Sequence, residues 1–460
     1  MSQSPRHLTA YVVFCVLTAA LSPFQFGFHA GVINPPRQAM SSAIPMTDWE
    51  WGAFVSLFLL GGVIGGLGGG HVASTLGRRR ALLCTNFLYT AGTLSITFAK
   101  GQSALYLGRL LTGIAAGIST VVVPVFINEL APPKSAGLLC SSNQTAIVMG
   151  ILISAVAGVW MATEKLWRGL FALNLIPNVI QWLLLPLCVE SPPWLAAQGL
   201  AQDNKEALAK LYNHSVDVEE ERILPEASEA GGADDDSVED VANGREESSA
   251  SPLPRHLSFK QLFASRTLRP HLMAALGLHI VQQFSGINAA IFYSTTIFME
   301  NYSIETATKL TVLVSVVNLI MTLLSAGLID TLGRRTLLLT SEAAMAFCAA
   351  AIFVANNVML APPAIVGFFL IAFVGSFAIG LGAIPWIILP ELLPAPAITV
   401  AASIGTGLNW GSAFLLALLF PVAISSLGYT VFLFFAVFLV ASFAATWKLV
   451  PETKGGVLRL

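Results

Sequence analysis

The chain has 460 residues, 55% of them hydrophobic and 11% charged, with a mean hydropathy of +0.73. Such a composition excludes a soluble globular protein and indicates an integral membrane protein, which has the lipid bilayer as its surroundings and no nucleic-acid partner. The formal net charge of −2 hides an uneven distribution, because half of the 26 acidic residues fall within residues 217–247.

Six apolar segments of about 20 residues, the length that crosses a bilayer, lie in the first part of the chain. Their centres fall near Ala20, Leu60, Tyr89, Ala116, Leu152 and Ile180. Arg6 before the first segment could indicate a signal peptide, but the apolar run continues to Ile33, which favours a retained first span. We therefore expect an N-terminal bundle of six helices over residues 1–195.

Residues 196–267 interrupt the apolar pattern. Within them, the acidic stretch 217–247 has few aromatic residues and cannot bury enough apolar surface to offset its chain entropy. We expect a cytoplasmic loop with short helices, for example over residues 202–212, and a disordered acidic segment.

Six further apolar segments are centred near Val281, Val317, Met345, Val374, Phe414 and Phe435, which predicts a second bundle and a short tail over residues 268–460. Residues 76–83, Leu-Gly-Arg-Arg-Arg-Ala-Leu-Leu, recur at 332–339 as Leu-Gly-Arg-Arg-Thr-Leu-Leu-Leu. This repeat indicates duplication of a six-span unit. The side that holds these loops is richer in Lys and Arg, so we expect it to face the cytoplasm together with both termini.

Three amides, Gln282, Gln283 and Asn288, lie inside one apolar span. Lipid offers such groups no hydrogen bonds, so they face a bundle interior or a wet cavity, where they often hold a polar ligand. Intramembrane amides can instead simply join helices to one another. From the residues alone, both interpretations stay open.

Residues 282–294 also resemble, almost residue for residue, the seventh helix of the facilitative hexose transporters, which are sugar porters of the major facilitator superfamily. Further motifs of that family follow in order: Pro-Val-Phe-Ile-Asn-Glu at 124–129, Glu-Ser-Pro-Pro-Trp-Leu at 190–195 and Val-Pro-Glu-Thr-Lys-Gly at 450–455. The resemblance implies an all-α major facilitator fold, with twelve transmembrane helices in two six-helix bundles around a central cavity. It also implies a transporter and no enzyme, with no cofactor, metal site or obligate protein partner.

The resemblance further implies a sugar pocket, in which amides bind hydroxyl groups and aromatic rings cover the apolar face of the sugar. The residues of this pocket are Gln144, Ile147, Ile151, Gln282, Gln283, Asn288, Asn318, Phe377, Trp386 and Asn409.

Two gates are implied as well. Phe292 and Tyr293 correspond to the external gate, where the family more often has two Tyr residues. On the cytoplasmic side, the resemblance implies a latch between the halves formed by Arg78, Arg79, Glu129, Asp330, Arg334, Arg335 and Glu391. The chain departs from the family in the tenth span, where residues 380–383 read Gly-Leu-Gly-Ala in place of Gly-Pro-Gly-Pro.

His29 in the first span and Arg109 in the fourth bear on whether sugar transport is coupled to the movement of a proton. In the family's proton symporters an Asp stands at the position of His29 and faces the Arg, so that a proton can move with the sugar. Burial and a nearby guanidinium both disfavour a charged imidazole. We therefore expect a neutral His29 and facilitated diffusion, with proton symport as the alternative.

The expected substrate is a hexose. Residues 279–281, His-Ile-Val, replace the Gln-Leu-Ser of glucose-selective members, and members with a similar sequence also accept fructose. We therefore expect glucose transport that need not exclude fructose, in the plasma membrane. A sugar sensor that binds without transporting is a further alternative.

Overall fold

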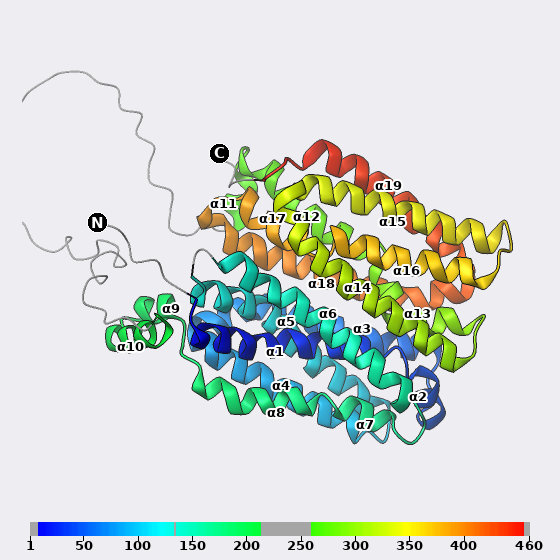
Figure 1. Cartoon of the computed structure of the whole chain (residues 1–460), viewed down its shortest axis with the longest axis horizontal. Helices are drawn as coiled ribbons and strands as arrows, with labels where there is room; N and C mark the ends of the chain where they lie inside the picture. The colour runs from blue at the N-terminus through cyan, green and yellow to red at the C-terminus, as the bar shows by residue number, and fades with distance from the viewer. Residues whose placement is uncertain (1–7, 133–134, 213–258, 455–460) are drawn as a thin grey trace, which may run out of the picture.

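The computed structural model describes residues 8–132, 135–212 and 259–454. The acidic segment 217–247, expected to be disordered, lies outside these residues. The long helices run lengthwise through the molecule, and the start of the first helix and the end of the last one lie at the same end of it (Figure 1). We call this the terminal end and the opposite one the distal end.

The first half carries the helices that precede the central gap in the described chain. They are α1 (Ala10–Gly31), α2 (Arg37–Ala43), α3 (Asp48–Leu76), α4 (Arg78–Thr97), α5 (Gln102–Leu130), α6 (Ala136–Met161), α7 (Trp167–Ala172), α8 (Leu175–Leu184), η1 (Leu185–Leu187), α9 (Pro192–Ala197) and α10 (Ala201–Tyr212). The last of these matches the helix expected near residues 202–212.

The second half begins at the terminal end with a short helix. Its elements are α11 (Phe259–Ala264), α12 (Leu268–Phe284), α13 (Ile287–Met299), α14 (Ile304–Leu332), α15 (Arg334–Asn357), α16 (Pro363–Ile379), α17 (Ile384–Leu392), α18 (Ala395–Leu427), η2 (Gly428–Thr430) and α19 (Val431–Leu449).

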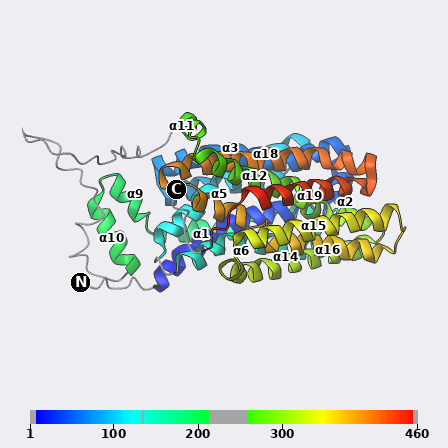
Figure 2. The same ribbon diagram turned by 90° about the horizontal axis from the view of Figure 1, so that it is seen from above.

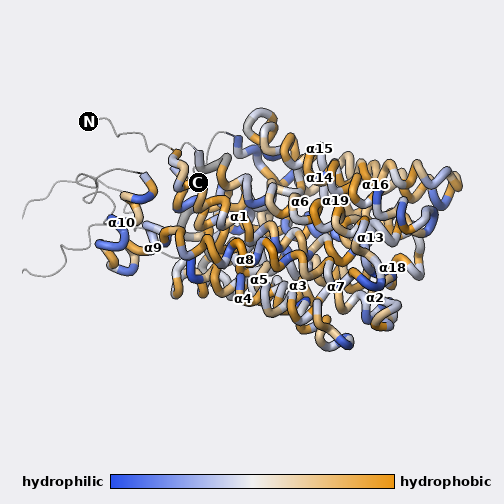
Figure 3. The backbone as a smooth tube through the Cα atoms, turned by 60° about the horizontal axis from the view of Figure 1, so that its bottom comes forward, coloured by the Kyte–Doolittle hydropathy of each residue, from blue (hydrophilic) through white to orange (hydrophobic). Residues whose placement is uncertain are grey.

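Nine segments of the described chain are long and apolar enough to cross a membrane, and one of them, Val400–Leu449, holds parts of two helices, α18 and α19. Two further spans complete the expected twelve: α4, which begins with three arginines, and the pair α12 and α13, which is interrupted at residues 285–286. Apolar residues dominate these helices, whereas hydrophilic residues gather in α10 (Figure 3). The structure is that of a multi-pass membrane protein.

The two copies of the sequence repeat fold alike. Gly77 and Gly333 both have φ +89°, a conformation that L side chains rarely adopt. A Cβ on either would lie 2.5 Å from the carboxylate of Glu190 or Glu452. These carboxylates accept the first N–H groups of α4 and α15, which have no partner within their helix.

The halves meet along three pairs of helices: α1 with α13, α3 with α18, and α6 with α14. Figure 2 shows α3 and α18 side by side. They approach closely at Gly62, where a Cβ would lie 2.1 Å from the ring of Trp410. Trp410 also lies 5.2 Å from the Phe26 ring and 6.0 Å from the Phe58 ring, so it joins α18 to both α1 and α3.

Candidate functional site

The seventh span, the second-half segment formed by α12 and α13, is interrupted. α12 ends at Phe284, and Gly286 takes the left-handed conformation with φ +95° before α13 begins at Ile287. A Cβ on Gly286 would lie 2.6 Å from the ring of Phe435, so both the turn and the packing require glycine. The break brings the side chains on both of its sides together.

Four predicted pocket residues, Gln282, Gln283, Asn288 and Asn409, form one hydrogen-bonded group, which we call the amide cluster. Gln283 Nε2 donates to Asn409 Oδ1 at 2.9 Å, Asn409 Nδ2 donates to Gln282 Oε1 at 2.6 Å, and Asn288 Nδ2 donates to Gln283 Oε1 at 2.6 Å. The amides therefore satisfy one another, and a hydroxylated ligand would exchange these bonds for its own.

Gln282 also reaches a second helix break. Its Nε2 donates to the carbonyl oxygens of Leu381 at 2.6 Å and Gly382 at 3.0 Å. These residues lie between α16, which ends at Ile379, and α17, which begins at Ile384. The amide cluster thus lies where the interrupted seventh and tenth spans meet.

Aromatic side chains adjoin this region. Trp386 on α17 is half-buried, and its ring meets that of His279 edge-on, with centroids 4.7 Å apart. Phe377 is buried in the last turn of α16, where its carbonyl accepts the N–H of Gly382. Both predicted aromatic residues therefore lie on the helices that flank the second break.

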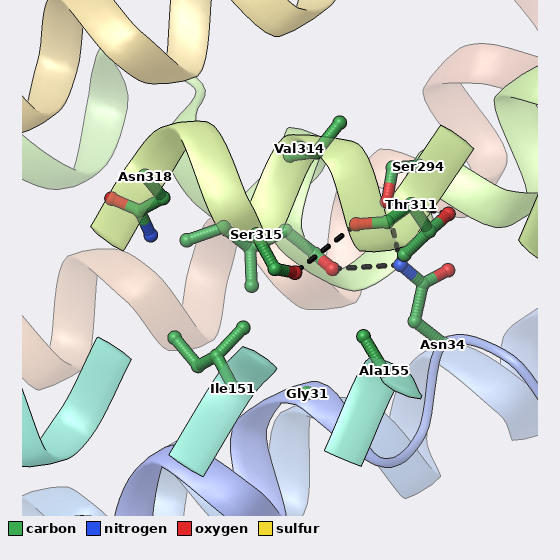
Figure 4. A pocket seen from close by; sticks show the side chains of 10 residues that line it. Gly31, Asn34, Ile151, Ala155, Ser294, Thr311, Val314, Ser315 and Asn318 are labelled. Atoms are coloured by element: carbon green, nitrogen blue, oxygen red, sulfur yellow. Dashed lines mark hydrogen bonds between the residues drawn. The ribbon is translucent and has the colours of Figure 1, made fainter. Parts of the chain in front are cut away.

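The remaining pocket residues lie toward the first half. Gln144 and Ile147 are half-buried on α6, and in the described part of the chain no hydrogen bond joins Gln144 to the amide cluster. Ile151 and Asn318 line a cavity of about 10 Å³ between the halves (Figure 4), which is room for about one water molecule. The structure brings Gln282, Gln283, Asn288 and Asn409 together, while among the described residues no hydrogen bond joins Asn318 or the residues of α6 to them.

The distal end is closed between the halves. Asn34, in the loop after α1, donates to Ser294 Oγ on α13 at 2.7 Å (Figure 4). The predicted gate residues Phe292 and Tyr293 are both buried on the same helix, and the Tyr293 hydroxyl donates to the carbonyl of Ala417 on α18. Asn34 was not among the residues expected at this gate.

At the terminal end, the predicted latch residues pair within each half. Arg78 binds Glu129 at 2.7 Å, and Arg334 binds Glu391 at 3.1 Å. A latch between the halves was expected, but each of these pairs joins the start of one helix to the end of another in the same bundle. Arg79 and Arg335 donate to the carbonyls of Cys188 and Trp447. The side chain of Asp330 lies outside the described part.

His29 is fully buried, and its side chain points toward α4 and α8. Its ring stacks on Tyr89 with centroids 5.7 Å apart. Nε2 lies 3.0 Å from Asn174 Nδ2 and 3.2 Å from Thr93 Oγ1. An amide N–H can only donate, so His29 Nε2 is the acceptor, and the ring is neutral at that nitrogen.

A backbone carbonyl fixes the direction of the hydrogen bond between Asn174 Nδ2 and His29 Nε2. Asn178 Nδ2 donates to the carbonyl of Asn86 at 3.1 Å, which identifies that atom as nitrogen, and it also donates to Gln25 Oε1 at 3.0 Å. Gln25 Oε1 then faces Asn174 Nδ2, which in turn meets His29. If the oxygen and nitrogen of the Asn174 amide were exchanged, its oxygen would face Gln25 Oε1, and neither atom could donate.

Arg109 contacts His29 through the backbone. Its Nη1 donates to the carbonyl of His29 at 2.8 Å, and its Nε donates to that of Phe54 at 3.3 Å. The guanidinium lies over the ring of Phe58, 4.4 Å from the centroid. In the part of the chain that the structure describes, no carboxylate pairs with this buried cation.

The sequence of the chain matches that of a known family. The family model "Sugar (and other) transporter" matches residues 15–459. The chain belongs to the sugar transporter family. The match confirms the resemblance to the sugar porters of the major facilitator superfamily, and with it the expectation of a transporter rather than an enzyme.

Relatives of this sugar transporter cover nearly all of it. The facilitated glucose transporter member 3 of dog is 34% identical over 98% of this chain and 91% of its own length, and human member 4 is 35% identical over 98% and 90%. The xylose transporter XylE from E. coli, in a partially occluded inward open conformation, superposes with a TM-score of 0.78 and 23% identity over 98% of this chain and all of its own. This structural likeness confirms the fold.

Several buried polar residues of this sugar transporter escaped the sequence analysis. They are Gln25, Asn34, Asn86, Asn174, Asn178 and Gln181, all less than 4% exposed. The rule that singled out Gln282, an amide inside an apolar span, applies equally to most of them. Trp410 gave no such signal, because an aromatic residue in an apolar helix is ordinary.

Proposed function

We propose that this sugar transporter carries hexoses across the membrane by facilitated diffusion, with its two halves exposing one site to each side in turn. The amide cluster is the observation that carries the proposal. It sets donors and acceptors of four amides at two breaks within the membrane-spanning helices, beside Trp386 and Phe377. A ring of hydroxyl groups with one apolar face fits that combination.

The proposed substrate is glucose, with fructose as a further substrate. Two of the relatives are named facilitated glucose transporters, and they match this chain over nearly its whole length. The ring of His279, in place of the Gln of glucose-selective members, packs against Trp386 at the edge of the site. The imidazole offers hydrogen-bonding groups that differ in number and position from those of a glutamine amide, so it would recognise a different pattern of sugar hydroxyls.

Facilitated diffusion, and not proton symport, is supported by the surroundings of His29. The ring accepts a hydrogen bond from Asn174 and has no carboxylate beside it among the described residues. A protonated ring would set an N–H group against an N–H group at that contact. The proposed transport step therefore moves sugar without a proton.

The proposed orientation of the protein in the membrane rests on the distribution of its positively charged residues. The arginine-rich loops, the start of α1 and the end of α19 lie at the terminal end, which we assign to the cytosol of a cell with this protein in its plasma membrane. Residues 1–195 and 268–460 would then form the two moving halves. With the distal gate closed through Asn34, the site would open toward the cytosol.

Uptake of labelled glucose into proteoliposomes tests the proposal. We expect equilibration that is independent of an inward proton gradient and is inhibited by unlabelled fructose, and we expect it to fall in the Gln283→Ala variant. Accumulation above equilibrium when the gradient is applied would establish symport. Binding of glucose without uptake would establish a sensor.

A further inference from the structure

The break between α16 and α17 leaves backbone groups without helical partners. The carbonyl of Phe377 takes the N–H groups of Gly380 and Gly382, at 3.3 and 2.9 Å. The N–H of Leu381 is thereby left without a backbone acceptor. A buried N–H with no partner is costly, so a break of this kind needs another group to complete it.

Ser341 on α15 supplies that group. Its Oγ accepts the N–H of Leu381 at 3.2 Å and donates to the carbonyl of Ser376 at 2.7 Å. Ser376 lies in the last turn of α16, where carbonyls also lack partners. One hydroxyl, only 1% exposed, therefore bridges the two sides of the break.

The packing fixes Ser341 in place. A Cβ on Gly380 would lie 2.3 Å from the carbonyl of Leu337 and 2.7 Å from Ser341 Cβ, so α15 and the break lie in direct contact. The usual residue of sugar porters at the position of Leu381 is Pro, which has no N–H. In this chain Leu381 restores an N–H group, and Ser341 provides its acceptor.

We infer that Ser341 is a positioning residue for Gln282. Through the Leu381 N–H it holds the Gly380–Leu381 peptide group, which directly precedes the two peptide groups whose carbonyls receive the Gln282 amide. With its nitrogen fixed on these carbonyls, Gln282 presents its oxygen to Asn409 and the amide cluster. Ser341 thus sets the orientation of a sugar-binding amide without touching the sugar. This inference rests on the proposed function of the cluster.

Concentration-dependent uptake of labelled glucose by the purified transporter in proteoliposomes tests it. Ser341→Ala leaves the Leu381 N–H unpaired, and we expect KM to rise about three- to tenfold. Leu381→Pro removes that N–H, loses some buried apolar contact and strains Gly380, whose ψ of −70° is unfavourable before a proline, so it costs stability. The double variant S341A/L381P should nevertheless return KM to within about twofold of wild type, because the unpaired group is gone. A KM for the double variant equal to that of Ser341→Ala would overturn the inference.

Ser325→Ala is the matched control. Ser325 on α14 is equally buried and donates to the carbonyl of Ile379 in the same helix end at 2.7 Å, but among the described residues it forms no hydrogen bond with Leu381. Its loss should leave KM unchanged. A fall in the number of folded carriers would lower Vmax in any variant, whereas a misplaced Gln282 raises KM.

Non-additivity separates positioning from general packing. In a Gln282→Ala background, Ser341→Ala should raise KM no further, because its effect passes through Gln282. Equal effects in both backgrounds would refute the inference.

The outcomes also separate the two proposals. If wild type takes up no sugar, the proposal of hexose transport fails. If Gln282→Ala raises KM and Ser341→Ala does not, only the role of Ser341 fails. Should Ser341→Ala not fold, recovery of folding and KM by Leu381→Pro decides the matter.

Discussion

The side-chain oxygen of Asn34 accepts the backbone N–H of Thr295 at 3.0 Å, which joins the loop after α1 to the middle of α13. The nitrogen of the same amide donates to the carbonyl of Ile291 at 2.9 Å. Ile291 and Thr295 are spaced as the two ends of one helical hydrogen bond. Asn34 therefore holds α13 by its backbone, whatever side chains that helix carries there.

Asn34→Ala is expected to open the distal end. The change removes the bonds to Ile291, Ser294 and Thr295 that the closed arrangement alone provides, and a loss of about 1 kcal/mol would raise the open population about fivefold. A cysteine placed at Ser315, which lines the small cavity, should then react about fivefold faster with an impermeant thiol reagent added outside. Gln102→Ala is the control, because Gln102 donates to Pro45 at the same end but within one half. Unchanged labelling in Asn34→Ala would show that Asn34 does not hold the gate.

Asn174→Asp is expected to make uptake sensitive to protons. A carboxylate at this position would accept an N–H from His29 Nε2 and favour the charged ring. Wild-type uptake should not respond to a proton gradient, whereas uptake by this variant should. Gln181→Glu is the matched control, because it adds the same charge to the same polar group but contacts Thr18, Ser22 and Gln25 and not His29. A gradient response in wild type would contradict the neutral state of His29.

Gln283→Ala and Asn318→Ala are expected to differ. Gln283 bonds both Asn288 and Asn409, so its loss should weaken glucose binding by about 1–3 kcal/mol and raise KM about 5- to 150-fold. Asn318 lines the separate small cavity, and its loss should raise KM less. Uptake kinetics measure both. The opposite order would place the sugar at the small cavity.

Glu190→Ala is expected to lower thermal stability. The Glu190 carboxylate accepts the N–H groups of Arg78 and Arg79 at the start of α4, so its loss should cost about 1 kcal/mol. Glu305→Ala should lower the melting temperature less, because Glu305 lies in the first turn of α14 but pairs with Lys309 on the exposed surface and accepts no backbone N–H among the described residues. Thermal unfolding of the purified proteins in detergent gives the melting temperatures. A melting temperature of Glu190→Ala equal to that of wild type would argue against the capping role of Glu190.

His279→Gln is expected to shift preference toward glucose. The added amide would face Trp386 at the position of the buried imidazole and would need a hydroxyl partner in a fixed place. Competition of fructose against labelled glucose should weaken about threefold, which corresponds to about 0.6 kcal/mol. Unchanged competition would show that the edge of the site at His279 does not select the sugar.

The sequence by itself determined the class and the outline of this protein. Apolar segments with the length of a bilayer predicted the spans, the repeated Gly-Arg-Arg loops predicted the duplication, and the amides of the seventh span indicated the candidate site. These signals are local, because lipid penalises each unpaired polar group wherever it lies along the chain. The break at Gly286 was not predicted, although the span that contains it was.

Only the tertiary structure decided which polar groups satisfy one another. Ser341 and Leu381 are 40 residues apart, and Asn34 and Thr295 are 261 residues apart. Neither pair has a periodic or local signature, because a hydrogen bond requires its donor and acceptor to be close in space whatever their separation in the chain. The same holds for His29. The Arg109 side chain was expected near the imidazole, and in the structure it donates to the backbone carbonyl of His29. The hydrogen bond from Asn174 leaves Nε2 of the ring without a proton.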